Sequence, residues 1–123
     1  MSAVVLDASA LLAFVAGEPG ADVVEESLTA EAVCGAANWS EVAQKVHQAG
    51  RDWDLVRALL LSYGLTIAPV EAADAERAAV RWRSGQGLSL GDRLCLALAD
   101  RLECLVLTAD TQWGDGDGIR QIR

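Results

Sequence analysis

The first regular segment of the chain is Val4-Val5-Leu6-Asp7-Ala8-Ser9, a short apolar run that stops at an aspartate. Residues 8–16, rich in alanine and leucine, follow at once and end at Gly17, which predicts a helix directly after a buried strand at 3–6. The same alternation continues along the chain. Further strands are predicted at 32–35, 65–70, 104–107 and 119–122, and further helices at 22–30, 38–48, 52–63, 71–84 and 89–102.

The predicted strands share a composition that indicates a parallel sheet. None of them alternates apolar with polar residues, a pattern typical of strands that are covered on both faces. Strands and helices that alternate in this way predict the α/β class, with three layers (α/β/α) around a mostly parallel central sheet. The 123 residues suit one domain, 1–123, without a repeat or linker.

The composition excludes several classes of protein. Apolar residues make up 52% and charged residues 23%, which is too apolar for a disordered chain. The longest apolar run, 55–65, is interrupted by Arg57, Ser62 and Gly64, so no membrane span is expected. The N-terminus lacks the basic residues of a secretory signal. Three cysteines without a C-x-x-C motif predict reduced thiols. We therefore expect a cytoplasmic domain.

The charge of the chain is the opposite of that found in proteins that bind nucleic acid by bulk attraction. Eighteen acidic and ten basic residues give a formal net charge of −8. Phosphate chemistry would have to depend on a bound cation or on a local arginine cluster. Arg77, Arg81 and Arg83, with Trp82, form such a cluster. It suits contact with RNA or with an acidic partner protein, but a solvated helix face explains it too.

Other catalytic schemes lack essential parts. The chain has no phosphate-binding G-x-x-x-x-G-K-[ST] loop. Its single histidine, His47, lies in a polar helical stretch and is predicted to be exposed. The glycines at 85–87 and 114–118 predict turns. The carboxylates remain as the candidates for chemistry.

Two aspartates follow predicted strands. Asp7 comes directly after the first strand, and Asp110 comes shortly after the strand at 104–107. In an open parallel sheet, ligands bind in the crevice beyond the carboxyl ends of the strands. We therefore expect Asp7 and Asp110 to share that crevice, although each also suits a helix N-cap.

Two further acids lie near the starts of predicted helices, in Asn38-Trp39-Ser40-Glu41 and Ser89-Leu90-Gly91-Asp92. Each acid follows a good capping residue by three positions, which is the pattern of a capping box. Capping alone explains Glu41 or Asp92 taken singly. Because helix starts and strand ends face the same edge of a doubly wound sheet, the four acids together favour a functional site.

Four clustered carboxylates require compensation. Two unit charges about 5 Å apart repel by roughly 3 kcal/mol at an effective dielectric of 20. A site of oxygen ligands alone suits Mg²⁺ or Mn²⁺ better than Zn²⁺. We expect helix N-termini to help keep Glu41 and Asp92 ionised. Such a site is suited to phosphoryl chemistry.

At these residues the sequence resembles the PIN-domain nucleases and, among them, the VapC-type toxins of bacterial toxin–antitoxin pairs. The resemblance spans essentially the whole chain. It is carried by four segments in order: Val5-Leu6-Asp7-Ala8-Ser9-Ala10-Leu11-Leu12, Asn38-Trp39-Ser40-Glu41-Val42, Ser89-Leu90-Gly91-Asp92-Arg93-Leu94-Cys95-Leu96-Ala97-Leu98-Ala99 and Leu107-Thr108-Ala109-Asp110.

The resemblance implies an endoribonuclease that depends on Mg²⁺ or Mn²⁺ and hydrolyses RNA with a metal-activated water. It implies that Asp7, Glu41, Asp92 and Asp110 form an acidic pocket. Asp7, Asp92 and Asp110 would hold the metal ion, and Glu41 would ligate it through water or act as a base. A homodimer and a cognate antitoxin that blocks the pocket are also implied.

Three further polar residues lie beside the expected site. Ser9 and Thr108 are placed to hold a water molecule or a carboxylate, and local hydrogen bonding at the strand ends explains them equally well. Asp115, with Asp117 two residues later, is a candidate additional ligand in a glycine-rich turn. Turn chemistry also accounts for both aspartates.

Two alternatives belong to other functional classes. One is a catalytically silent PIN-like scaffold that only binds a partner protein. The other is a phosphoacceptor signalling domain, which needs a lysine at the end of a late strand, whereas Lys45 lies in a predicted helix. The leucines at 55 and 59–61 exceed what one buried helix face needs, which favours a partner or a dimer.

Overall fold

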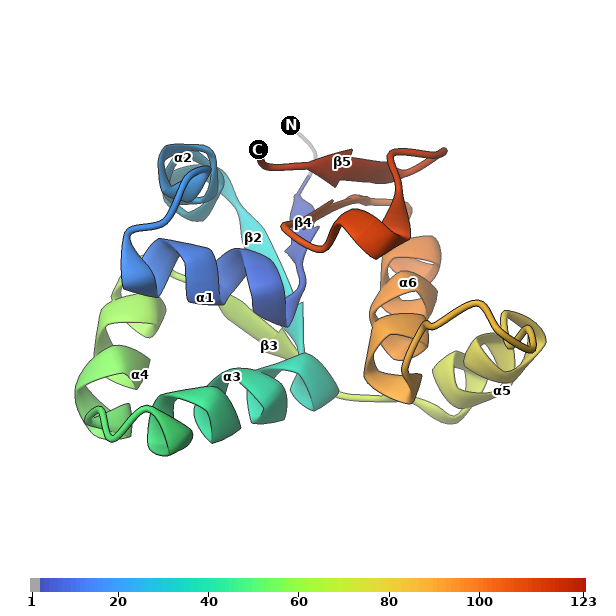
Figure 1. Ribbon diagram of the computed structural model, residues 1–123, viewed down its shortest axis with the longest axis horizontal. Helices are drawn as coiled ribbons and strands as arrows, with labels where there is room; N and C mark the ends of the chain where they lie inside the picture. Colours follow the sequence, from blue (N-terminus) through green and yellow to red (C-terminus); the bar gives the residue numbers. More distant parts are fainter. Residues whose placement is uncertain (1–2) are drawn as a thin grey trace.

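The computed structural model describes residues 3–123 as a five-stranded, wholly parallel sheet with helices on both faces (Figure 1). The strands lie in the order β3-β2-β1-β4-β5. This architecture confirms the predicted α/β class. The strands are β1 (Val4–Leu6), β2 (Ala32–Gly35), β3 (Thr66–Ala68), β4 (Leu105–Thr108) and β5 (Ile119–Gln121). The helices are α1 (Ala8–Ala16), α2 (Ala21–Ala30), α3 (Ala36–Gln48), α4 (Trp53–Ser62), α5 (Ala72–Val80) and α6 (Leu90–Leu102), and a short 3-10 helix, η1, covers Thr111–Trp113.

Successive residues of the central strands face two different cores. Val5 is buried in the core on the side of α6, whereas Leu6 is buried in the core formed with α1, α2, α3 and α4. The neighbouring strand β4 divides in the same way, with Val106 on the α6 side and Leu107 on the other. Because both faces are covered, the strands need apolar residues at every position, and this explains their lack of alternation.

Two predicted elements are shorter than expected. The strand at 65–70 is reduced to β3 because Pro69 has no N–H to continue the ladder. The helix at 71–84 ends at Val80. Beyond this end, the guanidinium of Arg83 donates to the carbonyls of Val80 and Trp82, both at 2.8 Å. A basic side chain at this place satisfies carbonyls that lack a helical partner.

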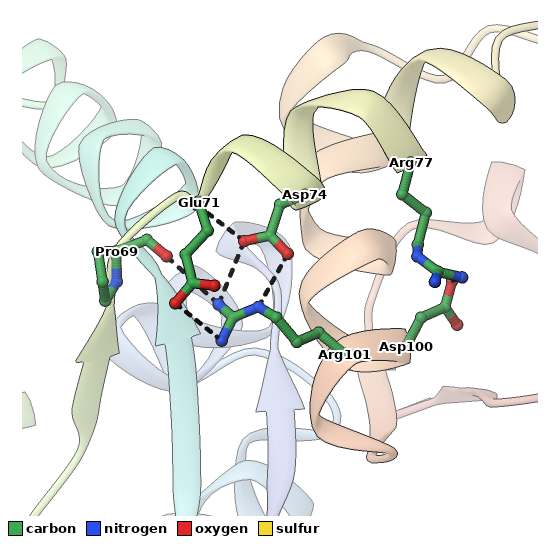
Figure 2. Close-up of polar contacts among 6 residues, drawn as sticks. All are labelled: Pro69, Glu71, Asp74, Arg77, Asp100 and Arg101. Atoms are coloured by element: carbon green, nitrogen blue, oxygen red, sulfur yellow. Dashed lines mark hydrogen bonds and ion pairs between the residues drawn. The ribbon is translucent and has the colours of Figure 1, made fainter.

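The helix α5 is fixed to α6 by a partly buried ion pair (Figure 2). Arg101 of α6 donates to both carboxylate oxygens of Asp74, at 2.9 and 3.1 Å, and lies 3.3 Å from Glu71. Asp74 is only 3% exposed, and it also accepts the N–H of Glu71 at 3.0 Å, which closes a capping box. The guanidinium holds the pKa of Asp74 below its usual value. This pair therefore secures α5 on the helix that carries Asp92.

Within residues 3–123, no helix combines the length and the apolar character needed to cross a bilayer.

We expect Asp74→Asn to lower the free energy of unfolding at pH 7 by about 2 kcal/mol, because it breaks charge-assisted hydrogen bonds to Arg101. The pKa of Asp74 is lowered in the folded state, so its contribution is present above the unfolded pKa of about 3.9 and is lost as the pH falls through the lower folded pKa. Urea unfolding at pH 7 and pH 3 measures both effects. Glu76→Gln, the same charge change at an exposed site of α5, is the control, and equal stability of the two variants at pH 7 would contradict the assignment.

Candidate active site

An acidic pocket of about 180 Å³ lies at the carboxyl ends of β1 and β4. Its four carboxylates come from four separate elements: the β1–α1 junction, α3, the first turn of α6, and the segment after β4. The four predicted acids therefore line one pocket, as expected from the parallel strands and helix starts. The lining consists of Asp7, Ala8, Ser9, Leu12, Glu41, Lys45, Asp92 and Asp110.

Asp7 is the most enclosed of the four acids, with 3% of its surface exposed. It is the N-cap of α1 and accepts the N–H of Ala10 at 2.8 Å. Burial raises the pKa of Asp7 from 3.8 to about 6, although hydrogen bonds from Thr108, Ala10 and Ser9 lower it and the charge of Asp92 adds to the rise. Hydrogen bonds therefore hold the Asp7 carboxylate in place, but they do not offset the cost of burying its negative charge.

Two hydroxyls connect Asp7 to the end of β4. Ser9 donates to the Asp7 carboxylate at 2.8 Å and accepts the N–H of Ala109 at 2.9 Å. Thr108 donates to Asp7 Oδ2 and accepts the N–H of Asp110 at 3.0 Å. Ser9 and Thr108 thus hold the Asp7 carboxylate and also bind N–H groups at the strand end. Both roles that the sequence suggested for these residues are present.

The prediction that Asn38 caps a helix and places Glu41 in its first turn is wrong. β2 runs directly into α3, which starts at Ala36 with Gly35 as the N-cap. Glu41 therefore lies in the second turn, away from the unpaired N–H groups that would keep it ionised. Burial instead raises the pKa of Glu41, the charge of Asp92 adds to the rise, and a hydrogen bond from Asn38 and the charge of Lys45 oppose it.

The other two acids act as helix caps and line the pocket as well. Asp92 Oδ2 accepts the N–H of Ser89 at 3.0 Å, and Ser89 Oγ accepts the N–H of Asp92 at 3.1 Å, so the predicted capping box is present. Asp110 caps η1 through the N–H of Gln112 at 2.9 Å. Each cap uses one carboxylate oxygen, which fixes the acid at the pocket while the second oxygen remains for a ligand.

Several residues lie differently from what the sequence suggested. Lys45, one turn beyond Glu41 on α3, lines the pocket, and its spacing of four residues from Glu41 was the signal for it. Asp115 and Asp117 are exposed and are not among the described residues that line the pocket. In the arginine cluster, Arg81 pairs with Asp100 at 3.0 Å and Arg77 approaches the same carboxylate at 3.9 Å.

The donor set suits a hard divalent cation. The pocket offers carboxylate oxygens, with neither histidine nor cysteine in its described lining. In the part of the chain that the structure describes, no three acidic, histidine or cysteine side chains converge closely enough to bind one ion directly. Mg²⁺ tolerates such a spread, because it keeps several of its waters and is commonly bound through one or two carboxylates.

Comparison with known proteins places this pocket in a known fold family. The PIN domain family model matches residues 4–118. The chain belongs to the PIN domain family. VapC ribonuclease Mb2780c of Mycobacterium bovis is 35% identical to this PIN domain over 106 residues, which cover 77% of the chain and 81% of the relative. Ribonuclease VapC42 of Mycobacterium tuberculosis shows the same identity and coverage. The resemblance to VapC-type PIN domains is confirmed.

Solved structures agree with this PIN domain in fold. A toxin–antitoxin complex from Klebsiella pneumoniae superimposes with a TM-score of 0.80 at 21% identity, covering 98% of both chains. VapC20 of Mycobacterium tuberculosis, described as a Sarcin-Ricin loop cleaving toxin, gives a TM-score of 0.67 at 16% identity, covering 94% of this chain and 92% of that one. DNA-bound VapBC from Salmonella typhimurium gives 0.71 at 13% identity over the full length of both chains. Membership of the PIN domain family argues against a phosphoacceptor signalling domain.

We expect the stability of the metal-free PIN domain to fall as the pH rises from 4 to 7, because Asp7 stays protonated in the folded state up to about pH 6. Below pH 4 Asp7 is protonated in both states. Between pH 4 and 6 only the unfolded state releases the proton, and above pH 6 the cost is complete, at about 3 kcal/mol.

Urea unfolding in EDTA across this pH range measures the slope. Asp7→Asn should reduce it, whereas Asp115→Asn, the same charge change in an exposed turn, should leave it in place. Parallel stability profiles for the wild type and Asp7→Asn would contradict the uncompensated burial of this carboxylate.

Proposed function

We propose that this PIN domain is an endoribonuclease that hydrolyses RNA phosphodiesters with Mg²⁺ or Mn²⁺ at the acidic pocket and acts as the toxin of a toxin–antitoxin pair. The observation that carries the proposal is the convergence of Asp7, Glu41, Asp92 and Asp110 on one pocket in a chain related to VapC ribonucleases. The expected location of such an activity is the cytoplasm.

Asp7, Asp92 and Asp110 are the proposed metal ligands. Ser9 and Thr108 hold Asp7 in place, and the caps hold Asp92 and Asp110. One or two of these carboxylates would contact the ion directly, and the ion's own waters would span the distance to the rest. When bound, the ion supplies positive charge for the scissile phosphate and lowers the pKa of a water molecule. The raised pKa of Asp7 supports this assignment, because no positively charged side chain among residues 3–123 compensates this buried carboxylate.

Glu41 is the proposed base. Its pKa is raised by burial and by Asp92, which brings its proton affinity closer to what a base needs near neutral pH. Glu41 would take a proton from the attacking water, and Lys45, on the next turn of α3, would hold a phosphate oxygen at the rim of the pocket. A net charge of −8 makes these local contacts necessary for RNA binding.

Protein partners are part of the proposal. Leu55 and Leu59 of α4 are 69% and 46% exposed and line an apolar groove of about 440 Å³. Val80 and Trp82, at the end of α5, are 72% and 59% exposed. Apolar surface of this kind supports binding of an antitoxin and formation of a homodimer. Two of the similar solved structures, described as a toxin–antitoxin complex and as DNA-bound VapBC, support the antitoxin.

Cleavage of RNA by purified protein, freed of any partner, tests the proposed activity. We expect cutting in Mg²⁺ or Mn²⁺ and none in EDTA. Asp92→Asn should reduce cleavage by at least about 100-fold, because it removes a charge while its side-chain oxygen still accepts the N–H of Ser89. Asp115→Asn is the control and should cut like the wild type. A wild type that cuts no RNA in either metal would indicate the silent scaffold instead, and cutting that survives in Asp92→Asn would indicate a contaminating nuclease.

Binding of the metal is tested without catalysis by thermal unfolding. Mn²⁺ should raise the Tm of the wild type by more than that of Asp7→Asn, because an ion that binds only the folded state stabilises it by mass action. Asp115→Asn should respond like the wild type. Equal increases in Tm for the wild type and Asp7→Asn would place the metal ion outside the acidic pocket.

A further inference from the structure

The Glu41 carboxylate is held by a buried amide. Asn38, only 1% exposed, donates from Nδ2 to Glu41 Oε1 at 2.8 Å. The same nitrogen donates to the carbonyl of Gly91 at 3.2 Å. Gly91 lies in the first turn of α6, beside Asp92. One side chain of α3 therefore joins Glu41 to the turn that carries a second acid of the pocket.

The direction of these contacts is opposite to that of a helix cap. A capping asparagine accepts backbone N–H groups through its side-chain oxygen, whereas Asn38 uses its nitrogen to donate. Its Oδ1 is buried and accepts no hydrogen bond from the described residues. Leaving a buried acceptor unpaired is unfavourable, so the amide is oriented for its two donor contacts rather than for its own satisfaction.

Gly91 provides the space that Glu41 occupies. A Cβ at this position would lie 2.8 Å from Glu41 Oε1, 3.1 Å from Cδ and 3.3 Å from Oε2. The backbone of Gly91 is outside the left-handed region, so the helix itself does not require glycine. Glycine is unfavourable within a helix compared with alanine. The close approach of the Glu41 carboxylate to Gly91 explains why this position has no side chain.

These contacts oppose a repulsion. Glu41 and Asp92 carry like charges in one small pocket, and without a cation Glu41 would be pushed away from the start of α6. The hydrogen bond from Asn38 draws Glu41 Oε1 towards Gly91 instead.

We propose that Asn38 and Gly91 are positioning residues for Glu41: the Asn38 amide fixes one carboxylate oxygen against the start of α6, and the absence of a side chain at Gly91 makes room for it. The role of this arrangement in cleavage rests on the proposed endoribonuclease function. The position of the Glu41 carboxylate can be tested independently of that function.

Gly91→Ala separates positioning from folding. The Cβ would meet the flexible end of Glu41, which can move, and alanine favours the helix. We expect a Tm equal to the wild-type value or about 2–4 °C higher, with kcat for RNA cleavage lowered about 10- to 100-fold and little change in KM. Gly116→Ala, where a Cβ meets nothing within 4 Å, is the matched control and should leave kcat unchanged. Wild-type kcat in Gly91→Ala would overturn the proposal.

Asn38→Ala tests the amide through a double-mutant cycle under single-turnover conditions. We expect it to slow cleavage when Glu41 is present and to have little further effect in a Glu41→Ala background. Equal losses of rate in both backgrounds would show a general structural role and overturn the proposal.

Crystal structures of the wild type, Gly91→Ala and Asn38→Ala make the test independent of activity. We expect the Glu41 carboxylate to contact α6 in the wild type and to move away in both variants. An unmoved carboxylate would overturn the proposal even if the protein cuts RNA. If the wild type cuts no RNA, the proposed function fails, while displacement in both variants would still support the positioning of Glu41.

Discussion

The buried Asp7 carboxylate is the interaction on which the rest of the site depends. It caps α1 through Ala10, and the hydroxyls of Ser9 and Thr108 connect it to the end of β4. Those hydroxyls in turn accept N–H groups from the residues that lead to Asp110. A single charged group therefore sets the start of a helix, the junction of two parallel strands and the position of a second acid. The protein keeps this arrangement although burial opposes the charge.

The remaining acids combine a structural contact with a place in the pocket. Asp92 and Asp110 each use one oxygen to cap a helix, so their positions follow from the local backbone. Glu41 has no such cap. Its carboxylate is located by the Asn38 amide of the same helix and by its close approach to Gly91 of α6. The ion pair between Asp74 and Arg101 acts at longer range, because it fixes α5 on the helix whose first turn carries Asp92 (Figure 2). Capping and ion pairing thus shape the site before any ligand binds.

The sequence predicted those parts of the fold and of the acidic pocket that depend on contacts between residues close together in the chain or on the direction of the strands. The convergence of Asp7 and Asp110 follows from parallel strands, and the Ser89–Asp92 box follows from spacing. The start of α3 was predicted two residues too late, because the Asn38 pattern suggested a cap while the direct passage from β2 placed the cap at Gly35. The role of Gly91 depends on the packing of α3 against α6, which the sequence alone does not reveal.

The junction between β1 and α1 contains no spare residue. Leu6 is the last residue of the strand, Asp7 is the cap, and Ala8 already belongs to the helix. Inserting or deleting one residue here would displace Asp7 from the Thr108 hydroxyl of β4 or move α1 away from the strand end. If β1 slipped by one residue to compensate, Val5 and Leu6 would exchange the sides on which they are buried. Changes of length are therefore confined to connections remote from the strand ends, such as the exposed segment 82–87. Insertions and deletions in segment 82–87 can change the surface of the protein, whereas the spacing from β1 to α1 stays fixed.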